Sequence, residues 1–181
     1  LFGIGVSARL VRESAASGGA DLITRIHRVE QQVEEATTAL RTTLRRLDTP
    51  HTPAGVLAVQ VREDLAAFGD RTGCRGHLLV IGDPEPLDGD RTDLLVQAVQ
   101  EGLRNIERHA NASEVVVTLG FGAGVVEAAL QDDGTGPTAG RGEGFGLRTL
   151  ARDLERVGGT VRLGRGEESG AILRVRVPVG P

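Results

Sequence analysis

The sequence contains no lysine, methionine, tryptophan or tyrosine, and it has a single cysteine, Cys74, among 181 residues. All 21 basic residues are therefore arginine, which excludes a catalytic or phosphate-binding lysine of the Walker type. One cysteine cannot form an internal disulfide or a metal cluster, so a packing role in a reducing compartment is expected for it. Aromatic residues make up only 2% of the chain, which leaves little to stack on nucleic-acid bases.

Long apolar runs are also missing, since no stretch reaches the ~20 residues that span a bilayer, and no signal-peptide pattern is present. The net charge of −4 is spread along the chain, so we expect no nucleic-acid partner. A hydrophobic content of 39% is enough for one core. The chain starts with leucine, and we expect a piece of a longer cytoplasmic protein, joined to a membrane only through upstream regions if at all.

Two helices are predicted before residue 50. The second, over 22–47, has apolar residues at nearly heptad spacing, and Ser17-Gly18-Gly19 is typical of a turn between it and an apolar first segment. Because two helices bury too little on their own, we expect this hairpin to dimerise into a four-helix bundle. Pro50 and Pro53 interrupt the helical pattern and predict a boundary, with a helical unit over 1–49 and a second domain over 50–181.

The second domain alternates helical and strand patterns and predicts an α+β fold, a two-layer α/β sandwich. In its last segment Ile172, Arg174 and Arg176 alternate with Leu173 and its apolar neighbours, so one face of the sheet should be wet and the other covered by helices. The expected helices are 54–68, 91–110 and 147–157, and the expected strands are 77–81, 114–119, 125–131, 160–163 and 172–177.

The expected helix over 91–110 has an apolar face and a polar one. Glu101, Asn105 and Arg108 stand at i, i+4 and i+7, so a carboxylate, an amide and a cation share one side. The Asn105 amide oxygen suits Mg²⁺ bridged to nucleotide phosphates, and Glu101 suits the polarisation of a nucleophile. The plain alternative for each residue alone is a solvated helix face.

Asp132-Asp133-Gly134-Thr135-Gly136 follows an expected strand and delivers a carboxylate into a glycine turn. Asp132 at the strand end can accept a hydrogen bond from an exocyclic amine such as adenine N6, while the glycines let a ligand approach the backbone. An ordinary Asp-Gly turn is the alternative.

Glycines at 140, 142, 144 and 146 come just before the expected helix 147–157. Free amides and the positive dipole end at this helix start favour a phosphate, and Pro137 to Glu143 would then serve as a lid. A surface loop without a ligand is the alternative. The order of the three segments argues against coincidence.

These segments resemble the N, G1 and G2 boxes of the GHKL (Bergerat) ATP-binding fold, at Glu101 to Ala110, Asp132 to Gly136 and Gly144 to Leu147. The flanking words Gln-Glu-Gly-Leu-Arg-Asn and His-Ala-Asn-Ala-Ser are similar to bacterial sensor histidine kinases that pair with NarL/LuxR-type response regulators. The hairpin over 1–49 resembles the dimerisation and phosphoacceptor domain of that group.

The resemblance implies a histidine kinase that takes Mg-ATP and passes the γ-phosphate to a histidine, then to a receiver-domain aspartate. It places the acceptor upstream of Leu1, so this fragment alone is not expected to autophosphorylate. It implies Asp132 at adenine, Asn105 at Mg²⁺ and Glu101 as the base or orienting carboxylate. The residues that it implies near the phosphates or around the pocket are Arg108, His109, Gly134, Gly136, Gly144, Gly146 and Leu147.

Two departures from the family pattern are present. Asp133 stands where the family often has asparagine, and Ala171 stands where many members have a threonine that helps to hold adenine. Three rival functions stay open from the sequence: a serine kinase acting as an anti-sigma factor, a clamp ATPase that would need a following transducer domain, and a dimerisation module that has lost nucleotide binding.

Overall fold

The computed structural model describes residues 55–137, 145–166 and 169–180. The expected hairpin over 1–49, the boundary at residue 50 and most of the expected lid lie outside these residues. The described helices and strands are α3 (Val56–Thr72), β1 (Arg75–Ile81), α4 (Gly89–His109), β2 (Glu114–Gly122), β3 (Val125–Asp132), α5 (Phe145–Glu155), β4 (Thr160–Arg165) and β5 (Ala171–Pro178).

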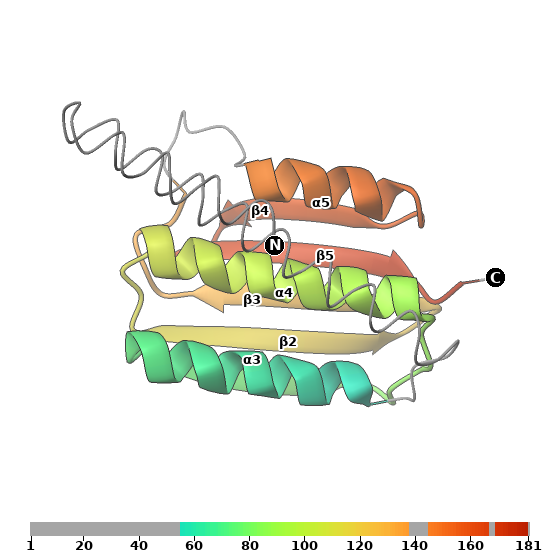
Figure 1. The fold of residues 1–181 in the computed structure, drawn as a ribbon, viewed down its shortest axis with the longest axis horizontal. Helices are drawn as coiled ribbons and strands as arrows, with labels where there is room; N and C mark the ends of the chain where they lie inside the picture. Colours follow the sequence, from blue (N-terminus) through green and yellow to red (C-terminus); the bar gives the residue numbers. More distant parts are fainter. Residues whose placement is uncertain (1–54, 138–144, 167–168, 181) are drawn as a thin grey trace, which may run out of the picture. The chain divides into compact units, whose positions relative to one another are not determined.

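The five strands form one sheet in the order β1-β2-β3-β5-β4. β1 and β2 run parallel, because α4 connects them as a crossover, while the other neighbouring strands are antiparallel. Figure 1 shows the three helices lying over one face of this sheet, with α4 between α3 and α5. The end of β3 lies beside the start of β5, because Gln131 pairs with Ile172.

The core lies between the helices and this face of the sheet. Along β2 and β5 alternate side chains are buried, so each strand turns one row inward and leaves the other row partly or fully exposed. α4 buries its apolar face from Thr92 to Ile106 on the sheet. The predicted α+β two-layer sandwich is therefore confirmed. Side chains less than 2% exposed include Phe68, Leu95, Leu119, Leu130, Leu150, Leu154, Val61, Val99, Val115, Val117, Val126 and Val175.

Local contacts explain where α4 begins. The Asp88 side chain accepts a hydrogen bond from the Arg91 amide at 2.8 Å, so the helix starts at Gly89, two residues before the expected start. Cys74 is buried in the core as expected, and burial raises the pKa of its thiol. Within the residues that the structure describes, no helix is long and apolar enough to cross a membrane.

β1 is less well buried than its neighbours. It pairs with β2 at one edge of the sheet, and Leu79, Val80 and Ile81 are each more than 40% exposed. His77, for which the sequence suggests no partner, lies 3.2 Å from the Glu114 carboxylate on β2. This edge therefore adds less buried apolar surface to the core than the central strands do.

Candidate functional site

Glu101 lies on α4 and its side chain is only 17% exposed. Arg104, one turn later, donates to Glu101 Oε2 from Nε at 3.1 Å and from Nη2 at 2.7 Å. The carboxylate also lies against Gly146 at the start of α5, since a Cβ added there would be 2.5 Å from Glu101 Cδ. Glycine at 146 thus allows α5 to approach the α4 carboxylate.

Asn105 lies one turn beyond Glu101 and is half-buried. Its side chain makes no hydrogen bond with the described part of the chain, so its amide oxygen is available to a ligand. Arg108 and His109 are exposed at the end of α4. The His109 backbone carbonyl accepts a hydrogen bond from the Thr135 hydroxyl at 3.3 Å.

Asp132 ends β3 and is only 5% exposed. Its Oδ1 accepts from the Gly134 amide at 2.9 Å, and its Oδ2 accepts from the Ala171 amide at 3.3 Å. A Cβ added at Gly170 would be 2.6 Å from the Asp132 carbonyl carbon. Asp132 therefore lies beside Ala171, the position at which the family resemblance expects a threonine.

The Asp-x-Gly turn rests directly on the end of α4. The Thr135 amide donates to the Ala110 carbonyl at 2.9 Å. A Cβ added at Gly134 would be 2.8 Å from the Ala110 carbonyl carbon, so only glycine fits there without moving the backbone. The helix segment and the turn segment thus touch, although about 20 residues of hairpin separate them.

Asp133 points away from this turn, into a separate network. Its Oδ1 accepts from the amides of Ser113 and Glu114 at 2.8 and 3.0 Å, and its Oδ2 accepts from the Ser113 hydroxyl. These hydrogen bonds, above all that from the Ser113 hydroxyl, lower the pKa of Asp133 below its ordinary value. Asp133 therefore fixes the start of β2 rather than facing the turn.

The remaining predicted residues divide between the turn and α5. Gly136 has φ of +74°, which favours glycine, and lies against Gly170. Leu147 lies on the buried face of α5, so its side chain packs in the core and is not open to a ligand. Gly144 lies outside the described residues.

The metal ligands that the described residues offer are few. These residues hold no group of three or more His, Cys, Asp or Glu side chains that could bind a metal. The Mg²⁺ contact expected at Asn105 therefore stays a prediction.

Sequence reasoning missed two parts of the site. Arg104 stands three residues after Glu101, a spacing at which helix side chains meet, so this pairing was available from the sequence. The Ser113–Asp133 contact joins residues 20 apart across a hairpin, and no spacing rule predicts it. A groove of about 610 Å³ was also missed, and it lies on β3, β4 and β5 and contains none of the predicted site residues.

Comparison with known proteins gives the following relatives. No protein-family model matches the chain. Sensor histidine kinase LnrJ of Bacillus subtilis is 30% identical over 135 residues, 74% of this chain and 32% of LnrJ. Sensor histidine kinase LiaS of the same organism is 25% identical over 185 aligned residues, 100% of this chain and 50% of LiaS. The ATP binding domain of PrrB from Mycobacterium tuberculosis has a TM-score of 0.59 at 24% identity, covering 74% of this chain and 99% of that domain.

The class of fold follows from this architecture and its structural neighbours. The sandwich, with a long helix beside a strand that ends in Asp132, is the GHKL fold of histidine kinase ATP-binding domains. The homologues of the chain are sensor histidine kinases, and its structural neighbours are histidine kinase ATP-binding domains. It spans from about a third to half of the length of these two curated relatives.

Proposed function

We propose that this chain is the catalytic core of a two-component sensor histidine kinase. It binds Mg-ATP and transfers the γ-phosphoryl group to a histidine on a dimerisation helix. In that step a phosphorus–nitrogen bond forms while the bond from the γ-phosphorus to ADP breaks. The phosphoryl group then passes to an aspartate on the receiver domain of a NarL/LuxR-type response regulator.

The observation that carries this proposal is the contact between three segments far apart in the sequence. Gly146 at the start of α5 lies against Glu101 on α4, and Thr135 of the Asp-x-Gly turn bonds to Ala110 at the end of α4. Residues of the G1 and G2 boxes therefore both contact the segment that carries the N box, at Glu101 and at Ala110. Such convergence supports a single nucleotide site, because no one segment could bind base, metal and phosphate alone.

Asp132 is the proposed adenine contact. Each of its oxygens already accepts one backbone amide, and each keeps a further lone pair for the exocyclic amine of adenine. The two amides also hold the carboxylate in one orientation before a nucleotide arrives, which lowers the entropic cost of binding. Ala171 supplies its amide but no hydroxyl to this contact.

Phosphoryl transfer in this site would depend on positioning and charge. Asn105 is the proposed Mg²⁺ ligand, and the metal neutralises phosphate charge when bound. Glu101 is the proposed base or orienting carboxylate, and Arg104 holds its orientation through two hydrogen bonds. Arg108 and His109, exposed at the end of the same helix, are proposed to meet the phosphates.

The chain is further proposed to act as a homodimer through residues 1–49, in the cytoplasm. These residues are not among those that the structure describes, so the proposal depends on their heptad pattern.

Isothermal titration with Mg-ATP and Mg-ITP tests the proposed site. ITP carries a carbonyl oxygen in place of the exocyclic amine. Two hydrogen-bond acceptors, this oxygen and the Asp132 carboxylate, would then face each other. Because a hydrogen bond to a charged group contributes about 1.5–3 kcal/mol, we expect ATP to bind at least about tenfold more tightly than ITP. Asp132→Asn, whose amide can donate to that oxygen, should bring the ratio close to one.

Asp70→Asn, which removes an exposed carboxylate on α3, is the matched control and should keep the preference for ATP. An equal affinity of the unchanged protein for both nucleotides would reject Asp132 as the adenine contact. Absence of heat with either nucleotide would favour the rival dimerisation module that has lost nucleotide binding.

A further inference from the structure

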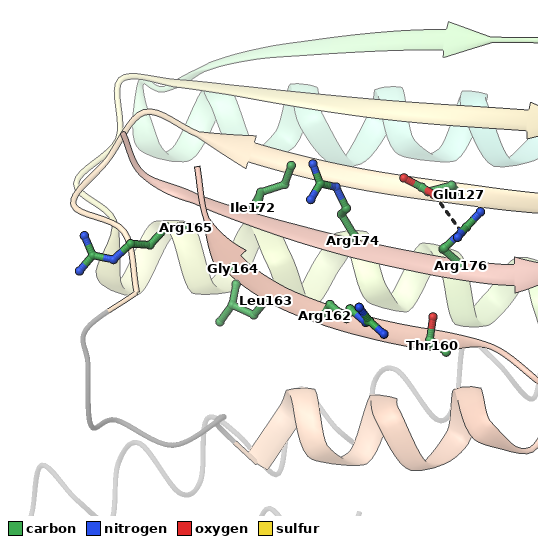
Figure 2. A pocket seen from close by; sticks show the side chains of 9 residues that line it. All are labelled: Glu127, Thr160, Arg162, Leu163, Gly164, Arg165, Ile172, Arg174 and Arg176. Carbon is green, nitrogen blue, oxygen red and sulfur yellow. Dashed lines mark ion pairs between the residues drawn. The ribbon is translucent and has the colours of Figure 1, made fainter. Parts of the chain in front are cut away.

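The outer face of the sheet, opposite the helices, carries a groove. Its volume is about 610 Å³, and Figure 2 shows the side chains that line it on β3, β4 and β5. Four of the nine lining residues are arginines and one is an acid. We call this set the arginine groove: Glu127, Thr160, Arg162, Leu163, Gly164, Arg165, Ile172, Arg174 and Arg176.

Strand register concentrates the positive charge. Arg162 on β4 stands directly opposite Arg174 on β5. Arg176 is neutralised by Glu127 at 3.0 Å, but neither Arg162 nor Arg174 has an ion pair within the described part of the chain. Like charges directly opposite on neighbouring strands destabilise a sheet. The opposed pair Arg162 and Arg174 therefore does not stabilise the fold, and its presence needs another explanation.

The shape of the groove follows from small and apolar residues between the arginines. Gly164 faces Ile172 across the strands and has no side chain, which leaves a hollow beside the guanidinium groups. Leu163 at the edge strand is 40% exposed and borders the same hollow. Arginine is one of the residue types enriched at protein interfaces.

The chemistry of the groove selects an acidic partner. Guanidinium groups bind carboxylates in a bidentate manner, and a local excess of positive charge on a chain of net charge −4 attracts a compact acidic surface. A long polyanion would meet repulsion from the rest of the chain. None of the lining residues is aromatic, so no base-stacking platform for nucleic acid is present in the groove.

The spacing of the arginines indicates the form of that acidic surface. Arg162 and Arg174 stand directly opposite each other on β4 and β5, which places their Cβ atoms about 4.5–5.5 Å apart. Side chains one turn apart on a helix are about 5–6 Å apart, a closely similar distance. We propose that the arginine groove is a docking surface for a protein partner that presents a helix with carboxylates one turn apart. This proposal does not depend on nucleotide binding.

The test uses the full 181-residue chain and a fluorescein-labelled helical peptide of about 20 residues with glutamate at every fourth position and leucine beside it. Fluorescence anisotropy measures its Kd for the unchanged protein and for Arg162→Gln/Arg174→Gln. The control is Arg71→Gln/Arg75→Gln, which removes the same charge from exposed side chains on α3 and β1. We expect the Kd to rise at least about tenfold in the groove variant and less than about twofold in the control.

Three outcomes would overturn the proposal: no binding to the unchanged protein, equal weakening in both double variants, or equal binding of a non-helical peptide of the same composition. Displacement of the peptide by tripolyphosphate at equal charge would also overturn it, in favour of a small-anion site. Loss of the fold is excluded separately by urea unfolding. Because the variant removes a like-charge pair, its unfolding midpoint should be equal or higher.

Discussion

Two adjacent carboxylates, Asp132 and Asp133, show how strongly position decides the role of a residue type. Successive side chains at a strand end point to opposite sides, so Asp132 turns toward Gly134 and Ala171 while Asp133 turns toward Ser113. The first is buried and is itself the proposed adenine contact, and the second fixes the start of β2. The family often has asparagine at the second position, and both residue types can accept the amides of Ser113 and Glu114 there.

A pH experiment on Asp133→Asn separates these roles. The pKa of Asp133 is below its ordinary value of 3.8 in the folded protein, so the unfolded chain takes up this proton first as the pH falls. The stabilisation by the carboxylate is thus complete above pH 3.8 and is lost as the pH falls through the lower folded pKa. Thermal unfolding should give the original protein a higher melting temperature than the variant at pH 7, and this difference in melting temperature should shrink as the pH falls below 3.8.

Asp70→Asn again serves as the comparison, because it removes one exposed carboxylate without touching this network. A difference between original and Asp133→Asn midpoints that stays constant from pH 7 to pH 3 would contradict the assignment.

At the residue scale, the sequence predicted which residues share one face of a helix, but it did not predict contacts between segments far apart in the chain. Glu101 and Asn105 were found from helical periodicity, and the same rule would have found the Arg104 partner of Glu101. The Asp133 network depends on a hairpin register that no local pattern encodes.

At the scale of elements, each described helix and strand was expected within a few residues of its place. Periodicity sufficed because α4 is apolar along one side and β2 and β5 alternate cleanly. The ends were missed where side chains decide them. α4 begins early because Asp88 caps it, and α3 continues to Thr72, beyond the expected end at 68, until Gly73 ends it with φ of +73°.

Two glycines at the junctions of α4 make a matched pair of substitutions. A Cβ at Gly134 meets the Ala110 backbone, which cannot yield, so Gly134→Ala should destabilise the protein by about 1–3 kcal/mol. A Cβ at Gly146 meets the end of the flexible Glu101 side chain, and alanine favours the helix by about 1 kcal/mol over glycine. Gly146→Ala should therefore leave stability nearly unchanged.

Urea unfolding of the two alanine variants measures this difference directly. Comparable losses in both would mean that Glu101 is held too rigidly by Arg104 to move aside, and that the contact between α5 and α4 is as tight as the backbone contact at Ala110.

At the scale of the whole molecule, the layer arrangement followed from the pattern of elements, but the strand order did not. The sequence indicated a wet face from the alternation of Arg174 and Arg176 with apolar residues. The arginine groove arises only because β4 pairs with β5 in a register that sets Arg162 against Arg174. Register depends on turn geometry and on which face of each strand is buried, so the pattern along one strand does not by itself pair Arg162 with Arg174.

The same sheet order predicts an uneven resistance to local opening. β3 is hydrogen-bonded on both sides, to β2 and β5, and alternate side chains are buried along it. β1 pairs with β2 alone among the described strands, and six of its seven residues are exposed. Opening β1 therefore uncovers little apolar surface, whereas opening β3 disrupts the core.

Native-state hydrogen exchange followed by NMR measures this difference. The comparison uses only amides bonded to a neighbouring strand, so that free edge amides do not contribute. β1 amides bonded to β2 should exchange at least about tenfold faster than those of β3, which should exchange only through global unfolding. Equal protection of the two strands would mean that the exposed edge at Leu79, Val80 and Ile81 is covered in solution, and so is itself an interface.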